Sequence, residues 1–292
     1  METIPAKSIV TRTKSAAWFG TRYNMNIYRG CCHGCIYCDS RSDCYGIENF
    51  DRVRAKENAL GIIRDELRRK VQRGVIGTGA MSDPYNPFEA ETQLTRHALE
   101  LISAYGFGVS IATKGTLVTR DIDVLREVAQ NAPVIVKLTI TCADDALARR
   151  IEPGAPPSSA RFEALRALSD AGIYAGVLLM PMLPWISDDR ENINAVAAMA
   201  GASGARFLYP GSLTLRTGQR EPFYAALDRS FPGLRERYET RFGTRYVASS
   251  PRARTLAGDL ADACRQNGLL SRMLDITRGY QRGYEIEQLS LF

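Results

Sequence analysis

The fold is decided by one stretch, Cys31-Cys32-His33-Gly34-Cys35-Ile36-Tyr37-Cys38. Three of its thiols form a C-x3-C-x2-C array, at Cys31, Cys35 and Cys38, after a strand-like run at residues 24–28. Thiolates this close together can converge on one metal centre. Structural zinc takes four protein ligands, and a [4Fe–4S] cluster is usually held by Cys thiolates. Because only three thiols are regularly spaced, a cluster would keep one iron free to bind another molecule.

Composition places the chain among ordinary globular proteins. Its 292 residues are 45% hydrophobic and 24% charged, which is typical of such proteins. The net charge of +6 permits an anionic partner without demanding one. Five of the seven cysteines fall within residues 31–44, unlike the spread, even set of a secreted disulfide framework. The longest apolar run, residues 174–182, is too short to span a bilayer. We therefore expect a cytoplasmic protein without a membrane segment.

Downstream of the cysteines, short apolar strands alternate with amphipathic helices. We expect five helices between six strands, which begin near Asn24, Val75, Gly108, Val134, Tyr174 and Ala205. Such alternation predicts parallel βαβ units. Five units fit either a doubly wound sheet or an incomplete barrel, and in both the ligand lies at the carboxyl ends of the strands.

The unusual residues fall at these strand ends. They are the cysteine stretch, Ser82-Asp83-Pro84-Tyr85, Thr113-Lys114-Gly115, residues 139–142 and Met180-Pro181. Because parallel strands end at the same edge of a sheet, we expect one mouth to collect all five. Beyond residue 223 the alternation weakens, and we expect two helices, at 224–238 and 252–266, and then an exposed tail at 285–292.

Cys31-x3-Cys35-Ile36-Tyr37-Cys38 resembles the C-x3-C-x-aromatic-C signature of the radical S-adenosylmethionine (radical SAM) superfamily. Other segments resemble its branch named for spore photoproduct lyase, often described as DNA-repair photolyase-like. They are Ser82-Asp83-Pro84-Tyr85-x-Pro-x-Glu89, Thr113-Lys114, Leu138-Thr139 and Ile151-Glu152-Pro153. The resemblance implies an α/β fold, a partial (β/α)6 TIM-type barrel, which we place at residues 23–222. An N-terminal extension (1–22) would precede it, and a C-terminal helical extension (223–292) would follow.

The resemblance also implies the chemistry. Cys31, Cys35 and Cys38 would ligate a [4Fe–4S] cluster, whose open iron would chelate the amino and carboxylate groups of S-adenosylmethionine. One electron, ultimately from a reducing donor, would cleave the cofactor to a 5′-deoxyadenosyl radical that abstracts hydrogen from a substrate. The roles implied around S-adenosylmethionine are amine acceptance by Ser82 and Asp83, carboxylate binding by Lys114 and Thr139, and adenine contact by Tyr37 and Met180.

Two departures separate this chain from members that repair the spore photoproduct. Those carry a hydrogen-donating Cys on the strand entering the Ser-Asp segment, where this chain has residues 77–81 without a thiol, and a Tyr where Asp39 stands. Cys142, after the fourth strand, is a candidate replacement donor, although a buried Cys is more often a small hydrophobe. The resemblance implies DNA or a nucleotide as substrate and chemistry of the lyase and DNA-repair class, whereas the two departures argue against repair of the spore photoproduct itself.

The last five residues carry a separate signal. Gln288-Leu289-Ser290-Leu291-Phe292 resembles the pentapeptide that binds the bacterial sliding clamp. Two Leu and a Phe would fill a hydrophobic groove, and a short tail can become ordered on binding. The alternative is that this tail folds back onto its own domain.

A function of another class also fits the residues. The chain could be a metal-stabilised DNA- or clamp-associated binding module without turnover, with His33 or Cys44 as a fourth zinc ligand. The joint presence of Tyr37, Ser82 and Lys114 favours a working site instead. Glu152 has two interpretations: it could end a segment before the next helix, or it could hydrogen-bond within the mouth.

Overall fold

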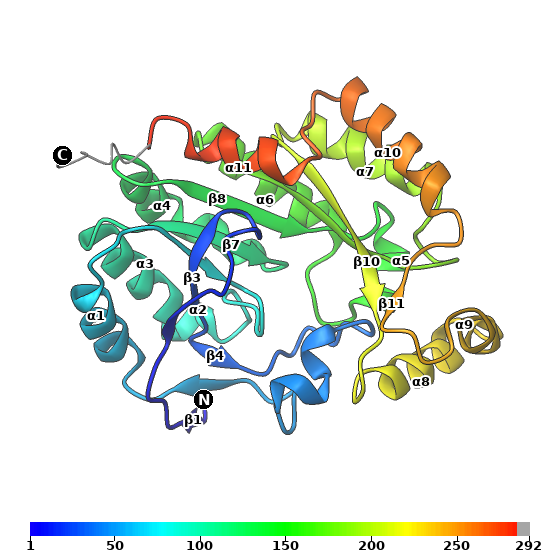
Figure 1. Cartoon of the computed structure of the whole chain (residues 1–292), viewed down its shortest axis with the longest axis horizontal. Coiled ribbons are helices and arrows are strands. Elements are labelled where there is room, and N and C mark those ends of the chain that lie inside the picture. The colour runs from blue at the N-terminus through cyan, green and yellow to red at the C-terminus, as the bar shows by residue number, and fades with distance from the viewer. Residues whose placement is uncertain (285–292) are drawn as a thin grey trace.

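The computed structural model describes residues 1–284 and has a curved eight-stranded sheet at its centre (Figure 1). Six strands are parallel neighbours in chain order: β3 (Thr21–Met25), β6 (Val75–Thr78), β7 (Gly108–Thr113), β8 (Val134–Thr139), β9 (Ala175–Met182) and β10 (Leu208–Thr214). In a doubly wound sheet the strand order reverses at a switch point. The sequential order therefore identifies a partial barrel and confirms the six predicted strands.

Short antiparallel strands occupy both edges of the sheet. β2 (Val10–Arg12) pairs with β3, and β11 (Val247–Ala248) pairs with β10. A second sheet contains β1 (Thr3–Ile4), β5 (Arg54–Lys56) and β4 (Tyr28–Arg29). The strand expected at residues 24–28 is thus divided, because β3 ends at Met25 and β4 joins the other sheet before the cysteine stretch begins.

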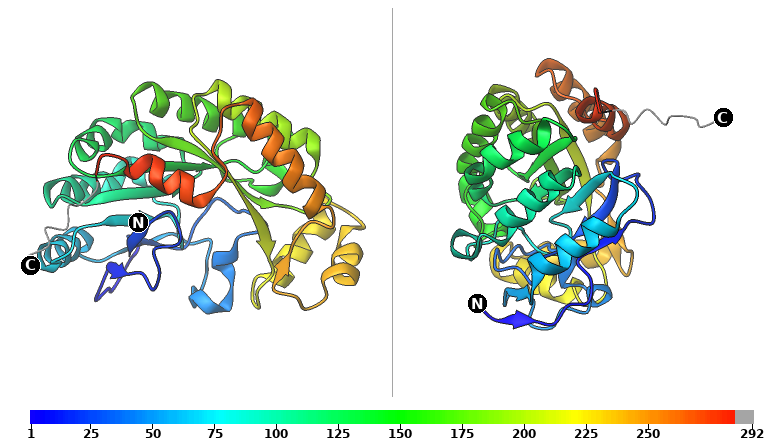
Figure 2. Two further views of the ribbon diagram at one scale, coloured as in Figure 1. Left: turned by 45° about the horizontal axis from the view of Figure 1, so that its top comes forward. Right: turned by 90° about the vertical axis from the view of Figure 1, so that its left-hand side faces the viewer.

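Helices connect the parallel strands and lie on one side of the sheet (Figure 2). The α-helices are α1 (Ala59–Arg69), α2 (Glu89–Thr92), α3 (Leu94–Ala104), α4 (Ile122–Ala129), α5 (Asp145–Ile151), α6 (Ser158–Asp170), α7 (Arg190–Ala202), α8 (Arg220–Ser230), α9 (Leu234–Phe242), α10 (Ala253–Gln266) and α11 (Met273–Gln281). The 3-10 helices are η1 (Asp39–Arg41), η2 (Asp43–Tyr45) and η3 (Thr116–Asp121).

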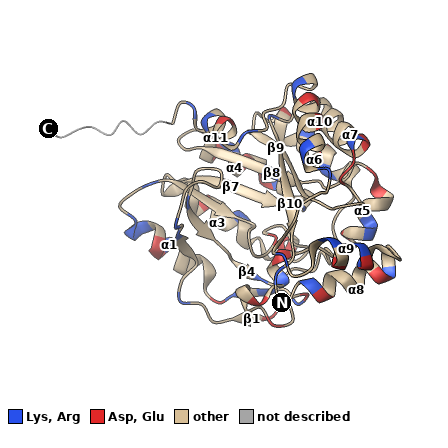
Figure 3. Cartoon of the chain, turned by 45° about the vertical axis from the view of Figure 1, so that its right-hand side comes forward, with Lys and Arg blue, Asp and Glu red and all other residues tan. Residues whose placement is uncertain are grey.

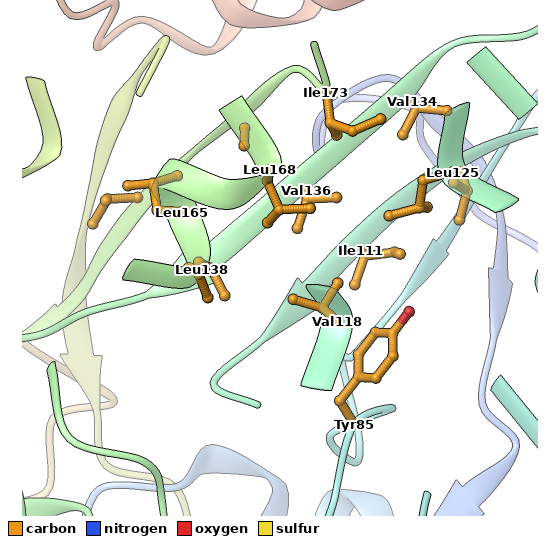
Figure 4. Packing of buried hydrophobic residues seen from close by; sticks show 14 of the residues in the cluster. Tyr85, Ile111, Val118, Leu125, Val134, Val136, Leu138, Leu165, Leu168 and Ile173 are labelled. Atoms are coloured by element: carbon orange, nitrogen blue, oxygen red, sulfur yellow. The ribbon is translucent and has the colours of Figure 1, made fainter. Parts of the chain in front are cut away.

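The main core lies between the sheet and the helices that connect its parallel strands. Val136 and Leu138 of β8 pack in the same apolar cluster as Leu165 and Leu168 of α6 (Figure 4). Because side chains alternate along a strand, the intervening residues of β8 point to the inside of the barrel. There Ile135 belongs to a second cluster that includes Phe19 and α11 residues. Both faces of the sheet are therefore covered, as parallel sheets require.

The C-terminal region differs from the predicted pattern. Residues 224–238, expected as a single helix, belong to α8 and α9. The helix breaks because Pro232 has no N–H to donate and Gly233 has a φ of +84°, which glycine adopts readily. The helices α5 and α11 were also not predicted. The tail motif at residues 288–292 lies outside the described residues. None of the helices within residues 1–284 is long and apolar enough to cross a membrane.

Candidate functional site

One pocket lies at the carboxyl ends of β6, β7 and β8. The cysteine loop (residues 31–38) closes it from the other side. The pocket is lined by seven of the residues predicted from the sequence, namely Cys31, Cys35, Cys38, Ser82, Asp83, Lys114 and Thr139. The pocket thus brings the three thiols together with the ends of three successive strands. Of the five segments expected at a common mouth it collects four, because Met180-Pro181 is not among its lining residues.

The cysteine loop is held in place by segments far away in the sequence. The N–H of Cys31 donates to the carbonyl of Phe50 (2.8 Å), and the N–H of Ile36 donates to that of Ile151 (2.9 Å). On the opposite wall, Gly79 adopts a φ of +94°, and a Cβ there would lie 1.9 Å from the carbonyl oxygen of Ala112. Only glycine permits this approach of two strand ends, and both residues line the pocket.

The two candidate fourth ligands of a zinc ion, His33 and Cys44, contact other side chains. Within residues 1–284, no three Cys, His, Asp or Glu side chains converge as ligands of a single metal ion. His33 instead lies with its Nδ1 3.4 Å from Asp83 Oδ2. Cys44 is exposed, and its thiol contacts Ser42 and Arg216. The three thiols line one pocket together with His33. A structural zinc ion would need a fourth protein ligand there, whereas three thiols leave one iron of a [4Fe–4S] cluster open.

Burial sets the protonation of the three thiols. It raises the pKa of Cys31 to about 12 and also raises the pKa of Cys35 and Cys38. Metal ligation requires the thiolate, and a bound cation reverses this preference. The site is therefore suited to cysteines whose ionised form depends on a bound metal centre.

Asp83 joins the two strand-end loops. Its carboxylate accepts the N–H of Tyr85 (2.9 Å), the N–H of Lys114 (2.7 Å) and the hydroxyl of Thr113 (2.5 Å). Ser82 donates its hydroxyl to the carbonyl of Gly30 at 2.5 Å, so its oxygen remains available as an acceptor. The predicted binding of an amino group by Ser82 and Asp83 stays a prediction, and the structure adds an organising role for Asp83.

Lys114 brings a positive charge into the pocket. Its Nζ lies 5.4 Å from the centre of the Tyr37 ring. Burial by itself disfavours the charge, but Cys35 and Glu152 outweigh it and raise the pKa of Lys114. A half-buried ammonium of this kind is a suitable partner for a carboxylate ligand.

Three predicted site residues are not among the residues that line the pocket: Tyr37, Met180 and Cys142. Tyr37 belongs to the cysteine loop, but its side chain packs in the apolar cluster with α8 and α9, and its hydroxyl donates to Glu152. Met180 packs against β10, where a Cβ on Gly211 would lie 2.7 Å from the Cβ of Met180. Cys142 is fully buried, and its Sγ is 3.6 Å from the carbonyl oxygen of Asp144. Their roles toward the cofactor and substrate stay predictions.

The interpretation of Glu152 left open by the sequence is resolved by its contacts. The buried carboxylate accepts hydrogen bonds from Tyr37, Thr141 (3.1 Å) and Arg161 (2.5 Å). Arg161 also donates to the carbonyl of Thr139 at 2.7 Å. Burial by itself would raise the pKa of Glu152, but Arg161 and Lys114 outweigh it and lower the pKa. The sequence does not predict the role of Arg161, because an arginine within a helix pattern is usually exposed and nothing in the pattern indicates that this one is buried.

The C-terminal helices complete the surroundings of the cysteine loop. Cys35 and Tyr37 share an apolar cluster with Phe223 of α8 and Tyr238 of α9. The side chain of Gln219 donates to the carbonyl of Tyr37 at 3.1 Å. Water is thereby kept from the back of the loop by residues outside the alternating βα segment.

Asp39, directly after the third cysteine, is tied to β10 and the loop that follows it. Its Oδ1 accepts the hydroxyl of Thr214 (2.9 Å) and the Nε–H of Arg216 (3.0 Å). These contacts anchor the end of the cysteine loop on the far strand of the barrel. The chain thus has an ion-paired Asp at the position where the family resemblance implies Tyr in members that repair the spore photoproduct.

Comparison with known proteins adds sequence relatives. The chain matches the family profile described as "Radical SAM superfamily" over residues 25–195. An uncharacterized protein of Mycobacterium tuberculosis is 34% identical over 239 residues, which cover 80% of this chain and 70% of the relative. An uncharacterized protein of Methanocaldococcus jannaschii is 30% identical over 239 residues, which cover 81% of this chain and 84% of that protein.

Solved structures share the fold at lower identity. A spore photoproduct lyase complexed with a dinucleoside spore photoproduct has a TM-score of 0.66 at 16% identity, covering 90% of this chain and 78% of the other. The radical S-adenosylmethionine methyltransferase TsrM from Kitasatospora setae has a TM-score of 0.55 at 12% identity, covering 82% of this chain and 51% of the other. The partial barrel is common to all three.

Proposed function

This chain belongs to the radical SAM superfamily, and from that premise we propose that it is an enzyme that abstracts hydrogen from DNA or a nucleotide. The cofactors of the family are a [4Fe–4S] cluster and S-adenosylmethionine, and its members need a reducing electron donor. The observation that carries the proposal is the single pocket in which Cys31, Cys35 and Cys38 face Ser82 and Lys114. A binding module without turnover would not need the three thiols, Ser82 and Lys114 in one pocket.

The chain's residues would hold the reactants in position. When bound, the cluster and S-adenosylmethionine supply a 5′-deoxyadenosyl radical. The three cysteines would hold the cluster, and Lys114 would bind the carboxylate of S-adenosylmethionine. The apolar cluster behind the cysteine loop excludes water on that side, which strengthens the charge interactions within the site.

A nucleic-acid substrate is supported by the similarity to spore photoproduct lyase, whose solved structure contains a dinucleoside, and by the net charge of +6. Figure 3 shows Lys and Arg intermixed with Asp and Glu along α8 and α9. Contacts with phosphates would therefore be local on these helices. This view does not show a uniformly basic surface that would attract a nucleic acid over a long distance.

The reaction we propose differs from spore photoproduct repair. The segment that leads from β6 into Ser82-Asp83 lines the pocket with Ala80 and Met81 and has no thiol. Asp39 is engaged by Thr214 and Arg216. The radical would thus form as in relatives, whereas the return of hydrogen to the product would follow another route. Cys142 remains our candidate donor for that step.

Anaerobic reconstitution with iron and sulfide tests the proposal. We expect a brown protein that, with a strong reductant, converts S-adenosylmethionine to 5′-deoxyadenosine. Oligonucleotides deuterated in base or sugar should then transfer deuterium into 5′-deoxyadenosine, and a Cys35→Ala variant serves as the control without a complete cluster. Absence of cleavage would refute the enzyme, and cleavage without deuterium transfer would refute the substrate class. One equivalent of zinc after anaerobic purification would favour the binding module.

The pentapeptide at residues 288–292 supports a location at replicating or repaired DNA. We expect its deletion to abolish binding to a bacterial sliding clamp and to leave cleavage of S-adenosylmethionine intact. Surface plasmon resonance with immobilised clamp measures the first, and product chromatography measures the second. Equal clamp affinity of the deleted and full-length chains would contradict the assignment.

A further inference from the structure

The cysteine loop rests on residues 151–154, at the end of α5. The N–H of Ile36 donates to the carbonyl of Ile151, and the N–H of Gly154 donates to that of His33 at 2.8 Å. A Cβ on Gly154 would lie 2.5 Å from the carbonyl oxygen of Cys32. The cysteine loop therefore contacts both ends of segment 151–154, through Ile36 at one end and His33 at the other. A displacement of the segment would move the cysteine loop.

Glu152 lies in the middle of this segment and connects the loop to the pocket wall. One carboxylate oxygen accepts the hydroxyl of Tyr37, which lies between Cys35 and Cys38. The other accepts Arg161, whose guanidinium also binds the carbonyl of Thr139. A continuous chain of buried hydrogen bonds thus joins Tyr37, which stands between Cys35 and Cys38 in the sequence, to Thr139, which lines the pocket.

The carboxylate also acts through its charge. Glu152 is fully buried, and its surroundings include the apolar cluster of Cys35 and Tyr37. Charges interact strongly across such a medium because the dielectric constant is low. Its hydrogen bond to Tyr37 places it beside the cysteine loop, next to the stretch from Cys35 to Cys38. A negative charge held there can influence an electron that arrives at the thiols.

We propose that Glu152 is a positioning residue that holds the cysteine loop against the S-adenosylmethionine pocket and lowers the reduction potential of the cluster. The geometric effect follows from the hydrogen bonds to Tyr37 and Arg161. The electrostatic effect follows because a nearby negative charge disfavours the addition of an electron. The inference rests on the cofactors of the proposed function and is independent of its substrate.

The chain offers a matched control. We name Tyr37, Glu152 and Arg161 the cluster-side triad. A second group of the same composition contains Tyr28, Glu89 and Arg120. We name it the loop-side triad, because Glu89 follows the Ser82-Asp83 loop. Glu89 is also fully buried and accepts the hydroxyl of Tyr28 and the guanidinium of Arg120 at 2.9 Å. Glu152→Gln and Glu89→Gln therefore each remove one fully buried carboxylate charge that is bound to a Tyr and an Arg, at different places in the fold.

Both variants are to be reconstituted beside the wild type and compared at equal iron content. For Glu152→Gln we expect a more positive midpoint potential in a redox titration followed by electron paramagnetic resonance. We also expect about 10- to 100-fold slower formation of 5′-deoxyadenosine, the usual range for losing an outer-shell partner of a metal site. For Glu89→Gln we expect a lower melting temperature with an unchanged midpoint potential.

The inference is overturned if Glu152→Gln keeps the wild-type potential, or if Glu89→Gln shifts the potential equally. Should Glu152→Gln fail to fold, Tyr37→Phe and Thr141→Val carry the test, since each removes one hydrogen bond and keeps the charge. We then expect weaker perturbation of the cluster spectrum by S-adenosylmethionine in Tyr37→Phe, and wild-type spectra in both would refute the positioning role. A wild type that forms no cluster would instead refute the proposed function.

Discussion

The cluster-side and loop-side triads contain the same residue types and differ in their partners. Arg161 is fully buried with Glu152, whereas the side chain of Arg120, beside Glu89, is 23% exposed. Arg120 also pairs with Asp121, and Glu89 also accepts the backbone N–H of Thr95 at 3.0 Å. The loop-side charges thus share several partners and some solvent, and the cluster-side charges depend mainly on each other.

Their surroundings give the two triads different consequences. The loop-side triad joins α2 to β4 through Tyr28 and to the segment before α4 through Arg120. Those contacts secure the scaffold behind the Ser-Asp loop. The cluster-side triad reaches the cysteine loop and the pocket wall. A buried Tyr, Glu and Arg therefore form a structural or a functional group according to what lies next to them.

The largest difference should appear when each arginine is removed. We expect Arg161→Met to lower the free energy of unfolding by about 3–5 kcal/mol, because it leaves the Glu152 carboxylate buried without its cation. Arg120→Met should cost about 1–2 kcal/mol, since Glu89 keeps its other donors. Urea denaturation of both apoproteins at pH 7 measures the pair. Equal losses would show that the exposure of Arg120 is irrelevant.

Lys137 provides the case of a buried charge with only a neutral hydrogen-bond acceptor. Its Nζ donates to the hydroxyl of Ser110 at 2.5 Å and lies 4.6 Å from the centre of the Phe19 ring. Burial lowers the pKa of Lys137 to about 7, from 10.5. Between these values the unfolded chain binds the extra proton, so stability should rise as the pH increases from about 7 to 10.5.

Lys137→Met should accordingly stabilise the protein at pH 7 by on the order of 3 kcal/mol and remove that pH-dependent rise. Thermal unfolding between pH 7 and pH 10 measures both effects. Lys7→Met, at an exposed position, is the control and should change stability by less than about 0.5 kcal/mol. A slope that persists in Lys137→Met would assign the pH dependence to another group.

Removing single hydroxyls compares the triads more gently. Tyr28→Phe and Tyr37→Phe should each cost about 1–2 kcal/mol, because each leaves a buried carboxylate with one donor fewer. Only Tyr37→Phe should also slow the formation of 5′-deoxyadenosine in reconstituted protein. Similar slowing in both variants would indicate that the loss of stability, and not the position of the triad, limits the reaction.

Among the residues near the cysteine loop, we expect substitution of Cys142 to have the smallest effect on stability. It belongs to the same apolar cluster as Tyr37, and Cys142→Ala should cost about 1 kcal/mol through a small cavity. We expect cleavage of S-adenosylmethionine to continue in this variant. If Cys142 is the hydrogen donor, the final product should disappear while 5′-deoxyadenosine still forms. Unchanged product formation would exclude that role.

Sequence patterns predicted the parts of the site that depend on local order. The spacing of Cys31, Cys35 and Cys38 and the segments after β6 and β7 indicated one pocket, and the structure brings them together there. The pattern was less informative beyond residue 223. The sequence contains the helix-breaking pair Pro232-Gly233. It does not indicate that α8 and α9 pack behind the cysteine loop.

The sequence by itself determined the alternation of strands and helices and the residues at the strand ends, because periodicity and chain direction are local properties. It left the choice between a barrel and a doubly wound sheet to the order of the strands. Only the tertiary structure decided that Glu152 meets Tyr37, 115 residues away, and that Arg161 is buried. Contacts over such distances depend on how separate elements pack, so the electrostatic surroundings of the three thiols emerge only in the folded chain.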